Sequence, residues 1–218
     1  MLKLKKLRGS LMLSINVIHK TSVKLLFGLS LVLLVSGCQS TLTDKQDLRP
    51  VEPKALASYK NALLVMKSGQ TQRALKLFNS IDKKYPGFAG PQLNIGLMHL
   101  KNNQLSKAEK SFRQAIKINR DNAIGYNLLG VVFRRSGKFI EAKEQYQLAI
   151  SKSPNYANAH LNLGVLYDLY MSDLSQAIHH YEQYQKFSTS NDSKVSKWIL
   201  DLKRRNNTQS NVKKGMKG

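Results

Sequence analysis

The sequence has one cysteine, few acidic residues and no apolar run long enough to cross a membrane comfortably. Because Cys38 is the only cysteine, no disulfide can form within the chain. The 13 acidic residues are outnumbered by 35 Lys and Arg, so the net charge of +22 favours acidic partners. The apolar run at residues 25–35 is too short for a comfortable bilayer span.

Sequence motifs for catalysis and metal binding are also lacking. The chain has no G-x-S-x-G, no phosphate-binding loop and no spacing typical of metal ligands. His179 and His180 are adjacent, so on a helix they point in different directions. His99 and His160 fall at packing positions of the repeat described below. We therefore predict that the protein is not an enzyme and needs no cofactor or metal.

Residues 1–37 have the layout of a secretory signal peptide. The basic residues Lys20 and Lys24 precede the apolar run, and the small residues Ser36 and Gly37 follow it. Two starts of translation stay open, Met1 and Met12.

The residues Val35-Ser36-Gly37-Cys38 resemble the lipobox of bacterial lipoproteins. The resemblance implies that the signal is cut before Cys38, that its thiol is diacylated and that its new amine is acylated with a fatty acid such as palmitate. Several acyl chains anchor a protein stably, because each buried CH₂ contributes about 0.8 kcal/mol. Gln39, where Asp would imply retention in the inner membrane, implies the periplasmic face of the outer membrane. Residues 38–54 then form the lipidated end and a flexible tether.

Residues 123–156 predict two antiparallel amphipathic helices with a turn at Ser136-Gly137. Small and aromatic residues return at a period of 34 residues before and after this unit, one residue late in the last second helix. The predicted packing residues in this pattern are Gly96, Ala108, Phe112, Gly130, Ala142, Tyr146, Gly164, Ala177 and Tyr181.

A period of 34 residues with these residue types resembles the tetratricopeptide repeat, or TPR. The alternative is a series of unrelated amphipathic hairpins of similar length. The resemblance implies an all-α fold, a right-handed superhelix of four helix-turn-helix repeats. We place these repeats at residues 55–88, 89–122, 123–156 and 157–191.

Residues 192–205 predict a C-terminal helix that caps the open end of the fourth repeat. The alternative is a free helix that binds a partner. Residues 206–218 are polar and basic, and we expect them to be disordered. The apolar face of the capping helix consists of Val195, Trp198, Ile199 and Leu202.

By resemblance to the TPR family, the first helices of the repeats line a concave groove that binds an extended or helical protein segment. Its apolar members Leu97, Val131 and Val165 should be exposed in the free protein; the alternative is that they pack between neighbouring first helices. Some TPR proteins hold a carboxylate with a Lys/Asn/Arg clamp, and of the corresponding positions only Asn94 matches. The predicted groove residues are Tyr59, Leu63, Met66, Leu93, Asn94, Leu97, Lys101, Asn127, Val131, Arg134, Arg135, Leu161, Asn162, Val165 and Leu169.

These features predict an outer-membrane TPR lipoprotein that faces the periplasm and acts as a protein-interaction scaffold or assembly adaptor. In layout it resembles the pilotin-type TPR lipoproteins of type IV pilus biogenesis, which help a secretin reach or assemble in the outer membrane. The alternative is an adaptor for enzymes of peptidoglycan synthesis or hydrolysis.

The positive charge is unevenly distributed along the chain. Repeats one to three carry net charges of +5, +4 and +3, the fourth carries −2, and residues 192–218 carry +6. Because a secreted lipoprotein rarely meets nucleic acid, an acidic protein or anionic lipid headgroups fit this charge better. The alternative is a solvated basic surface without a partner.

Overall fold

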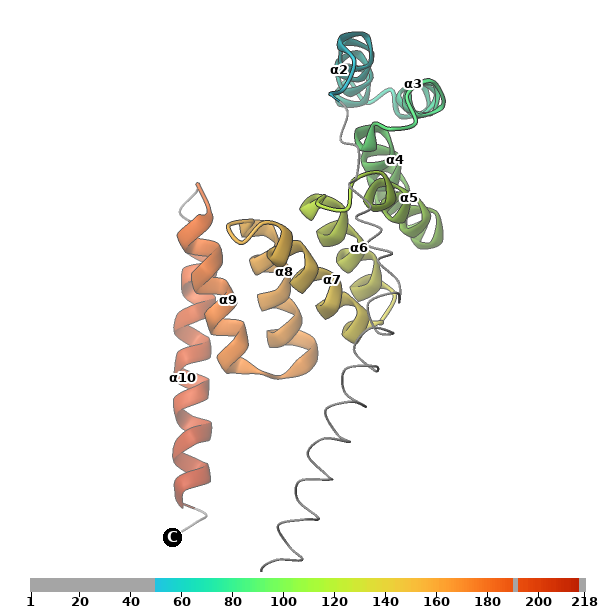
Figure 1. Cartoon of the computed structure of the whole chain (residues 1–218). Coiled ribbons are helices and arrows are strands. Elements are labelled where there is room, and N and C mark those ends of the chain that lie inside the picture. Colours follow the sequence, from blue (N-terminus) through green and yellow to red (C-terminus); the bar gives the residue numbers. More distant parts are fainter. Residues whose placement is uncertain (1–49, 190–191, 216–218) are drawn as a thin grey trace, which may run out of the picture. The chain divides into compact units, whose positions relative to one another are not determined.

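The computed structural model describes residues 50–189 and 192–215, and the predictions for the signal peptide, Cys38 and most of the tether lie outside this part. Within the described residues the chain forms nine α-helices, one π-helical turn and no strand (Figure 1). None of the helices described is both long and apolar enough to span a bilayer.

Eight of the helices form four consecutive pairs, each a first and a second helix. The pairs are α2 (Pro53–Lys67) with α3 (Thr71–Lys84), α4 (Ala89–Lys101) with α5 (Leu105–Ile118), α6 (Ala123–Arg135) with α7 (Phe139–Lys152), and α8 (Ala157–Leu166) with α9 (Leu174–Phe187). The π-helical turn η1 (Tyr167–Met171) follows α8, and α10 (Ser193–Gly215) follows the last pair. This arrangement confirms the predicted all-α solenoid of four helix pairs and a capping helix.

The turn inside each pair contains one residue with a left-handed backbone. These residues are Gly69, Asn103, Gly137 and Ser172, with φ angles of 81°, 57°, 74° and 55°. Glycine adopts this conformation without steric cost and asparagine tolerates it, whereas the conformation is uncommon for serine. The chain therefore reverses at equivalent places in all four repeats.

Within three of the pairs, a glycine of the first helix contacts an aromatic ring of the second. A Cβ atom on Gly130 would lie only 2.6 Å from two ring carbons of Tyr146. Gly96 meets the ring of Phe112 in the same way, and its Cβ would lie 2.5 Å from the nearest ring carbon. All nine packing residues of the sequence pattern are buried. In these three repeats the core thus contains an aromatic ring that packs directly against a glycine of the first helix.

The helix α10 covers the exposed end of the fourth repeat. Val195, Ile199 and Leu202 are buried and belong to the same apolar cluster as Tyr181 of α9. Trp198 differs from its predicted role, because it is 43% exposed while its ring centroid lies 5.5 Å from that of Tyr181.

The ends of the helical region also differ from the prediction. The helix α2 begins at Pro53, two residues inside the predicted tether, since proline is tolerated in the first turn of a helix. The helix α10 continues to Gly215. Residues 206–215, which we expected to be disordered, are therefore helical. No proline or glycine interrupts residues 206–214, and extending an existing helix costs far less than nucleating one.

Candidate partner-binding groove

The predicted groove depends on the first helices lying beside one another. Contacts join α4 to α6 and α6 to α8, while each first helix packs most extensively against its own second helix. Residues that recur every 34 positions on the first helices therefore form rows across the repeats.

One of these rows is apolar. It consists of Leu63, Leu97, Val131 and Val165. Leu97 is 39% exposed, as expected for a residue that lines a groove. Val131 and Val165 are only half-exposed and pack against the core clusters of repeats three and four, and Leu63 packs in the same way in repeat one. The expectation that all of Leu97, Val131 and Val165 would be exposed is thus correct for Leu97 alone.

The amide side chains connect successive first helices. Asn94 Nδ2 donates hydrogen bonds to Tyr59 Oη at 2.6 Å and to the Gly90 carbonyl at 3.0 Å. Asn162 Nδ2 donates to Asn127 Oδ1 at 2.9 Å. Asn94 and Asn127 are only 7% and 4% exposed. These amides hold the first helices in register, and a ligand could not reach them without displacing those bonds.

The hydroxyl of Tyr59 remains protonated in this arrangement. Burial raises the pKa of Tyr59, and the hydrogen bond from Asn94 opposes this effect without cancelling it. The ring of Tyr59 also contacts Phe88 edge-on, with centroids 4.9 Å apart. Tyr59 is therefore a half-buried support for the first two repeats rather than a titrating group.

The two arginines at the end of α6 are engaged within the protein. Arg135 donates from Nη1 to the Leu100 carbonyl at 2.9 Å and from Nη2 to Asn103 Oδ1 at 3.0 Å. Arg134 Nε donates to Tyr146 Oη at 3.4 Å. Of the three basic residues predicted at the rim, Lys101 is exposed and the arginines tie α6 to its neighbours.

The other predicted lining residues vary in exposure. Met66, Leu93 and Leu161 are half-buried, and Leu169 is 66% exposed. Sequence reasoning missed the exposed Leu56 and Ile124. Both occupy the second position of their predicted repeats, 55–88 and 123–156, so the 34-residue period itself could have revealed them.

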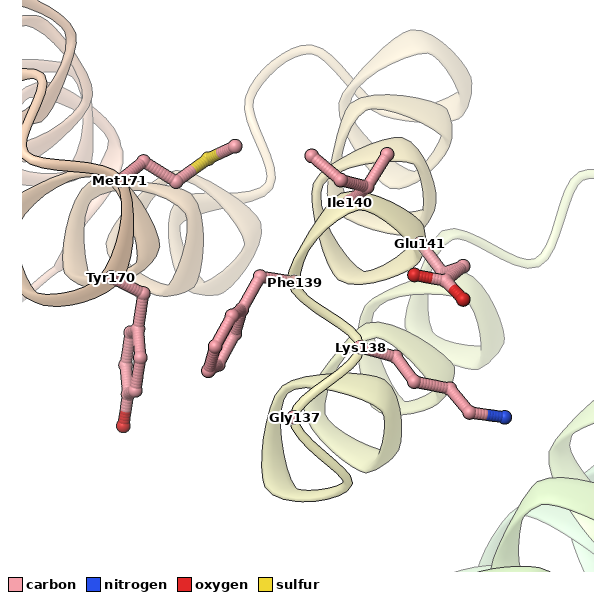
Figure 2. A pocket seen from close by; sticks show the side chains of 7 residues that line it. All are labelled: Gly137, Lys138, Phe139, Ile140, Glu141, Tyr170 and Met171. Carbon is pink, nitrogen blue, oxygen red and sulfur yellow. The ribbon is translucent and has the colours of Figure 1, made fainter.

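The extra residue in repeat four creates a second surface feature. It is accommodated by η1, which ends at Met171 and is followed by Ser172. Tyr170 of η1 lies beside Phe139, with ring centroids 4.5 Å apart. Figure 2 shows the two rings next to each other at the edge of an open pocket, with Ile140 and Met171 also lining it. The late alanine in the sequence indicated the insertion but not its π-helical form.

Two histidines of the fourth repeat, the buried His160 and the half-buried His180, lie within hydrogen-bonding distance of each other. His160 Nε2 lies 3.0 Å from the Pro154 carbonyl, so it carries the proton that it donates there. Its Nδ1 then accepts from His180 Nδ1 at 3.1 Å. Burial, then repulsion by His160 and His179, lowers the pKa of His180 to about 4. Among the residues that the structure describes, no group of three His, Cys, Asp or Glu could hold a metal ion.

Comparison with family models identifies the repeat. The model described as "TPR repeat" matches residues 132–169, and the model described as "Tetratricopeptide repeat" matches residues 89–122. The chain contains TPR repeats. The predicted resemblance is thereby confirmed for the repeat region.

Curated proteins match over a small part of their own length. The chain is 31% identical over 98 residues to the peroxisomal targeting signal receptor of Candida glabrata, which covers 45% of this chain and 16% of that protein. It is 37% identical over 86 residues to the probable N-acetylglucosaminyltransferase SPINDLY of Petunia hybrida, covering 39% of this chain and 9% of that protein. The matched region thus spans less than a fifth of these relatives, and the likeness concerns TPR repeats.

Solved structures show the same fold at low identity. Pseudomonas aeruginosa pilF has a TM-score of 0.63 and 19% identity, covering 71% of this chain and 69% of that chain. A double mutant of MamA RS-1 has a TM-score of 0.60 and 14% identity, covering 77% and 93%. The first TPR of Spaghetti (RPAP3), bound to an HSP90 peptide, has a TM-score of 0.50 and 16% identity, covering 54% and 91%.

Proposed function

We propose that this protein is a lipid-anchored TPR scaffold on the periplasmic face of the outer membrane, where it binds a segment of another protein. The anchor rests on the lipobox resemblance that ends at Cys38. The binding function rests on the TPR repeats, since such repeats can bind peptides, as the Spaghetti structure bound to an HSP90 peptide illustrates.

The observation that carries the binding function is the exposed Leu97 in an otherwise half-buried apolar row. A partner side chain can cover Leu97 and touch the remaining exposed surface of Leu63 and Val131 on either side. Each Å² of apolar surface removed from water contributes about 25 cal/mol, so a partner with apolar side chains gains binding free energy by covering this row.

The partner is not an acidic C-terminal peptide held by a carboxylate clamp. The corresponding positions hold Tyr59, Leu63, Ile124 and Leu128, none of which is a cation. The matching Asn94 is buried and already bound to Tyr59. An apolar or amphipathic segment therefore fits this surface better than a carboxylate.

The pathway we propose is type IV pilus or secretin assembly in the outer membrane. The support is the layout of lipobox, short tether and TPR repeats, which resembles the pilotin-type lipoproteins. The likeness to pilF is a likeness of fold and is compatible with this role.

The test compares two charge insertions at sites of equal exposure. Leu97 on α4 and Leu148 on α7 are 39% and 40% exposed, so Leu97→Asp and Leu148→Asp should each disturb folding little. In the complex, the carboxylate of an aspartate at position 97 would lose its water without gaining a cation or hydrogen-bond donor, which costs several kcal/mol. Val131→Asp is less suitable, because Val131 packs against the core.

Partners are captured from solubilised membranes with wild type and both variants, and then identified. We expect Leu97→Asp to lose a protein that the wild type and Leu148→Asp retain. Equal retention by all three would place the binding surface elsewhere, and a captured murein enzyme would replace the pilus assignment.

A further inference from the structure

Exposed basic residues line the second helices of repeats one and two. Arg73, Lys76 and Lys83 of α3 lie on the side of the helix opposite its buried ring, Phe78. Successive members are separated by three and seven residues, so they form one stripe along the helix.

The same stripe recurs on α5, displaced by 34 residues. It consists of Lys107, Lys110 and Lys117, opposite the buried ring of Phe112. Both α3 and α5 pack against α4. We call these six exposed cations the α3–α5 basic face.

This face is confined to the first two repeats. On α7 the positions equivalent to Lys107 and Lys110 are Glu141 and Glu144, which are also exposed. The two acidic residues on these helices interact with residues outside the basic face. Glu109 pairs with Arg113 at 2.9 Å, and Asp82 accepts a hydrogen bond from Gln92 Nε2 at 2.8 Å. The α3–α5 basic face is thus a local feature of the first two repeats rather than a consequence of the overall positive charge.

The arrangement is unfavourable for the isolated protein. Arg73 and Lys107 lie in the first turns of α3 and α5, where the positive end of the helix dipole repels cations. Lys76 and Lys110 follow one turn later, which adds like-charge repulsion along each helix. Such an arrangement does not stabilise the fold, and an anionic partner would offset the repulsion.

We propose that the α3–α5 basic face binds the headgroups of anionic lipids at a membrane surface. The large hydrophobic residues found exposed in the described chain include none from α3 or α5. Protein interfaces depend on aromatic and other apolar anchors and are depleted in lysine, so this face lacks what a protein partner needs. Diffuse attraction to anionic headgroups requires only clustered cations.

The proposal does not depend on the groove. The basic face lies on second helices, whereas the proposed groove is formed by first helices. Leu97→Asp should therefore keep its affinity for anionic vesicles, and failure of either proposal leaves the other intact.

The test measures partition of the full-length chain onto vesicles of phosphatidylcholine alone and of phosphatidylcholine with phosphatidylglycerol. Binding through the N-terminal apolar segment is common to both vesicles, so the difference between them isolates the electrostatic part. The face variant combines Arg73→Glu, Lys76→Glu, Lys107→Glu and Lys110→Glu. The matched control reverses four other exposed lysines: Lys54→Glu, Lys60→Glu, Lys67→Glu and Lys197→Glu.

The face variant should lose at least a hundredfold of the partition that phosphatidylglycerol adds, since each cation near an anionic surface contributes about fivefold. The control should lose much less, and high salt should abolish the difference. The face variant should melt at or above the temperature of the wild type, because the reversal relieves repulsion. Equal losses in both variants would overturn the proposal, as would binding of poly-L-glutamate, but not of vesicles, to this face.

Discussion

Replacing Gly130 by leucine tests the packing register on which every structural assignment depends. The glycine lies on α6 against the ring of Tyr146, which is fully buried on α7. A Cβ at position 130 would lie 2.6 Å from two ring carbons, whereas ordinary contacts begin at 3.4 Å. The ring cannot move into open space, because it is enclosed and its hydroxyl accepts a hydrogen bond from Arg134.

The expected cost is the difference between two effects. Overpacking a closed core costs about 1–3 kcal/mol, and this contact falls at the upper end because the ring must retreat by most of an ångström. Removing glycine from a helix interior returns about 0.8 kcal/mol. The net destabilisation is therefore about 1–2 kcal/mol, or a fall in melting temperature of roughly 2–8 °C for a chain of this size.

A double-mutant cycle isolates the contact itself. Tyr146→Ala alone should cost about 3–5 kcal/mol, by analogy with the loss of other large buried rings. In that background Gly130→Leu should become neutral or stabilising, because its side chain fills the space that the ring leaves, with a coupling energy of about 1–3 kcal/mol. Gly87→Ala is the control, since a Cβ there would meet nothing within 4 Å.

The assay is thermal and urea unfolding followed by circular dichroism. An equal effect of Gly130→Leu with and without the Tyr146 ring would show that the two residues do not touch. No effect in either background would refute the helix register of the third repeat.

Three further predictions follow from other parts of the chain. Cys38→Ala should accumulate as an uncleaved precursor that does not incorporate labelled palmitate; normal maturation would refute lipidation. The pKa of His180 is lowered to about 4 from an unfolded value near 6.5, so its contribution to stability is complete above pH 6.5 and is lost as the pH falls toward 4. His180→Phe should therefore weaken the fall in melting temperature across this range, and an unchanged slope would contradict the pairing with His160. Leu202→Asp should detach α10 and shift the fluorescence of Trp198, the only tryptophan, to longer wavelength, which a free helix would not show.

The repeat architecture could be predicted from the sequence because its determinants are local and periodic. Gly130 and Tyr146 keep the same spacing as Gly96 and Phe112, and a close helix crossing explains why a glycine lies opposite a ring in three of the four repeats. The turn at Gly137 could also be predicted from the sequence, since its positive φ angle is one that glycine adopts freely.

The candidate groove could be placed on the first helices by the same period, but the period does not report burial. Whether Val131 is exposed depends on how closely α6 approaches its neighbours, and the tertiary structure shows it half-covered. Asn94 and Asn127 have the same sequence pattern whether they bind a ligand or a neighbouring first helix. Only the folded geometry shows that Asn94 bonds to Tyr59 of α2 and Asn127 to Asn162 of α8.

The sequence predicted the first part of the C-terminal helix, and the tertiary structure decided its length. Its apolar stripe predicted that it would cover repeat four, because Val195, Ile199 and Leu202 share one helical face. Composition alone then argued for disorder beyond residue 205, since a polar segment cannot bury enough surface to order itself. In the folded protein α10 is already nucleated against α9, so the polar residues extend an existing helix instead of forming a new one.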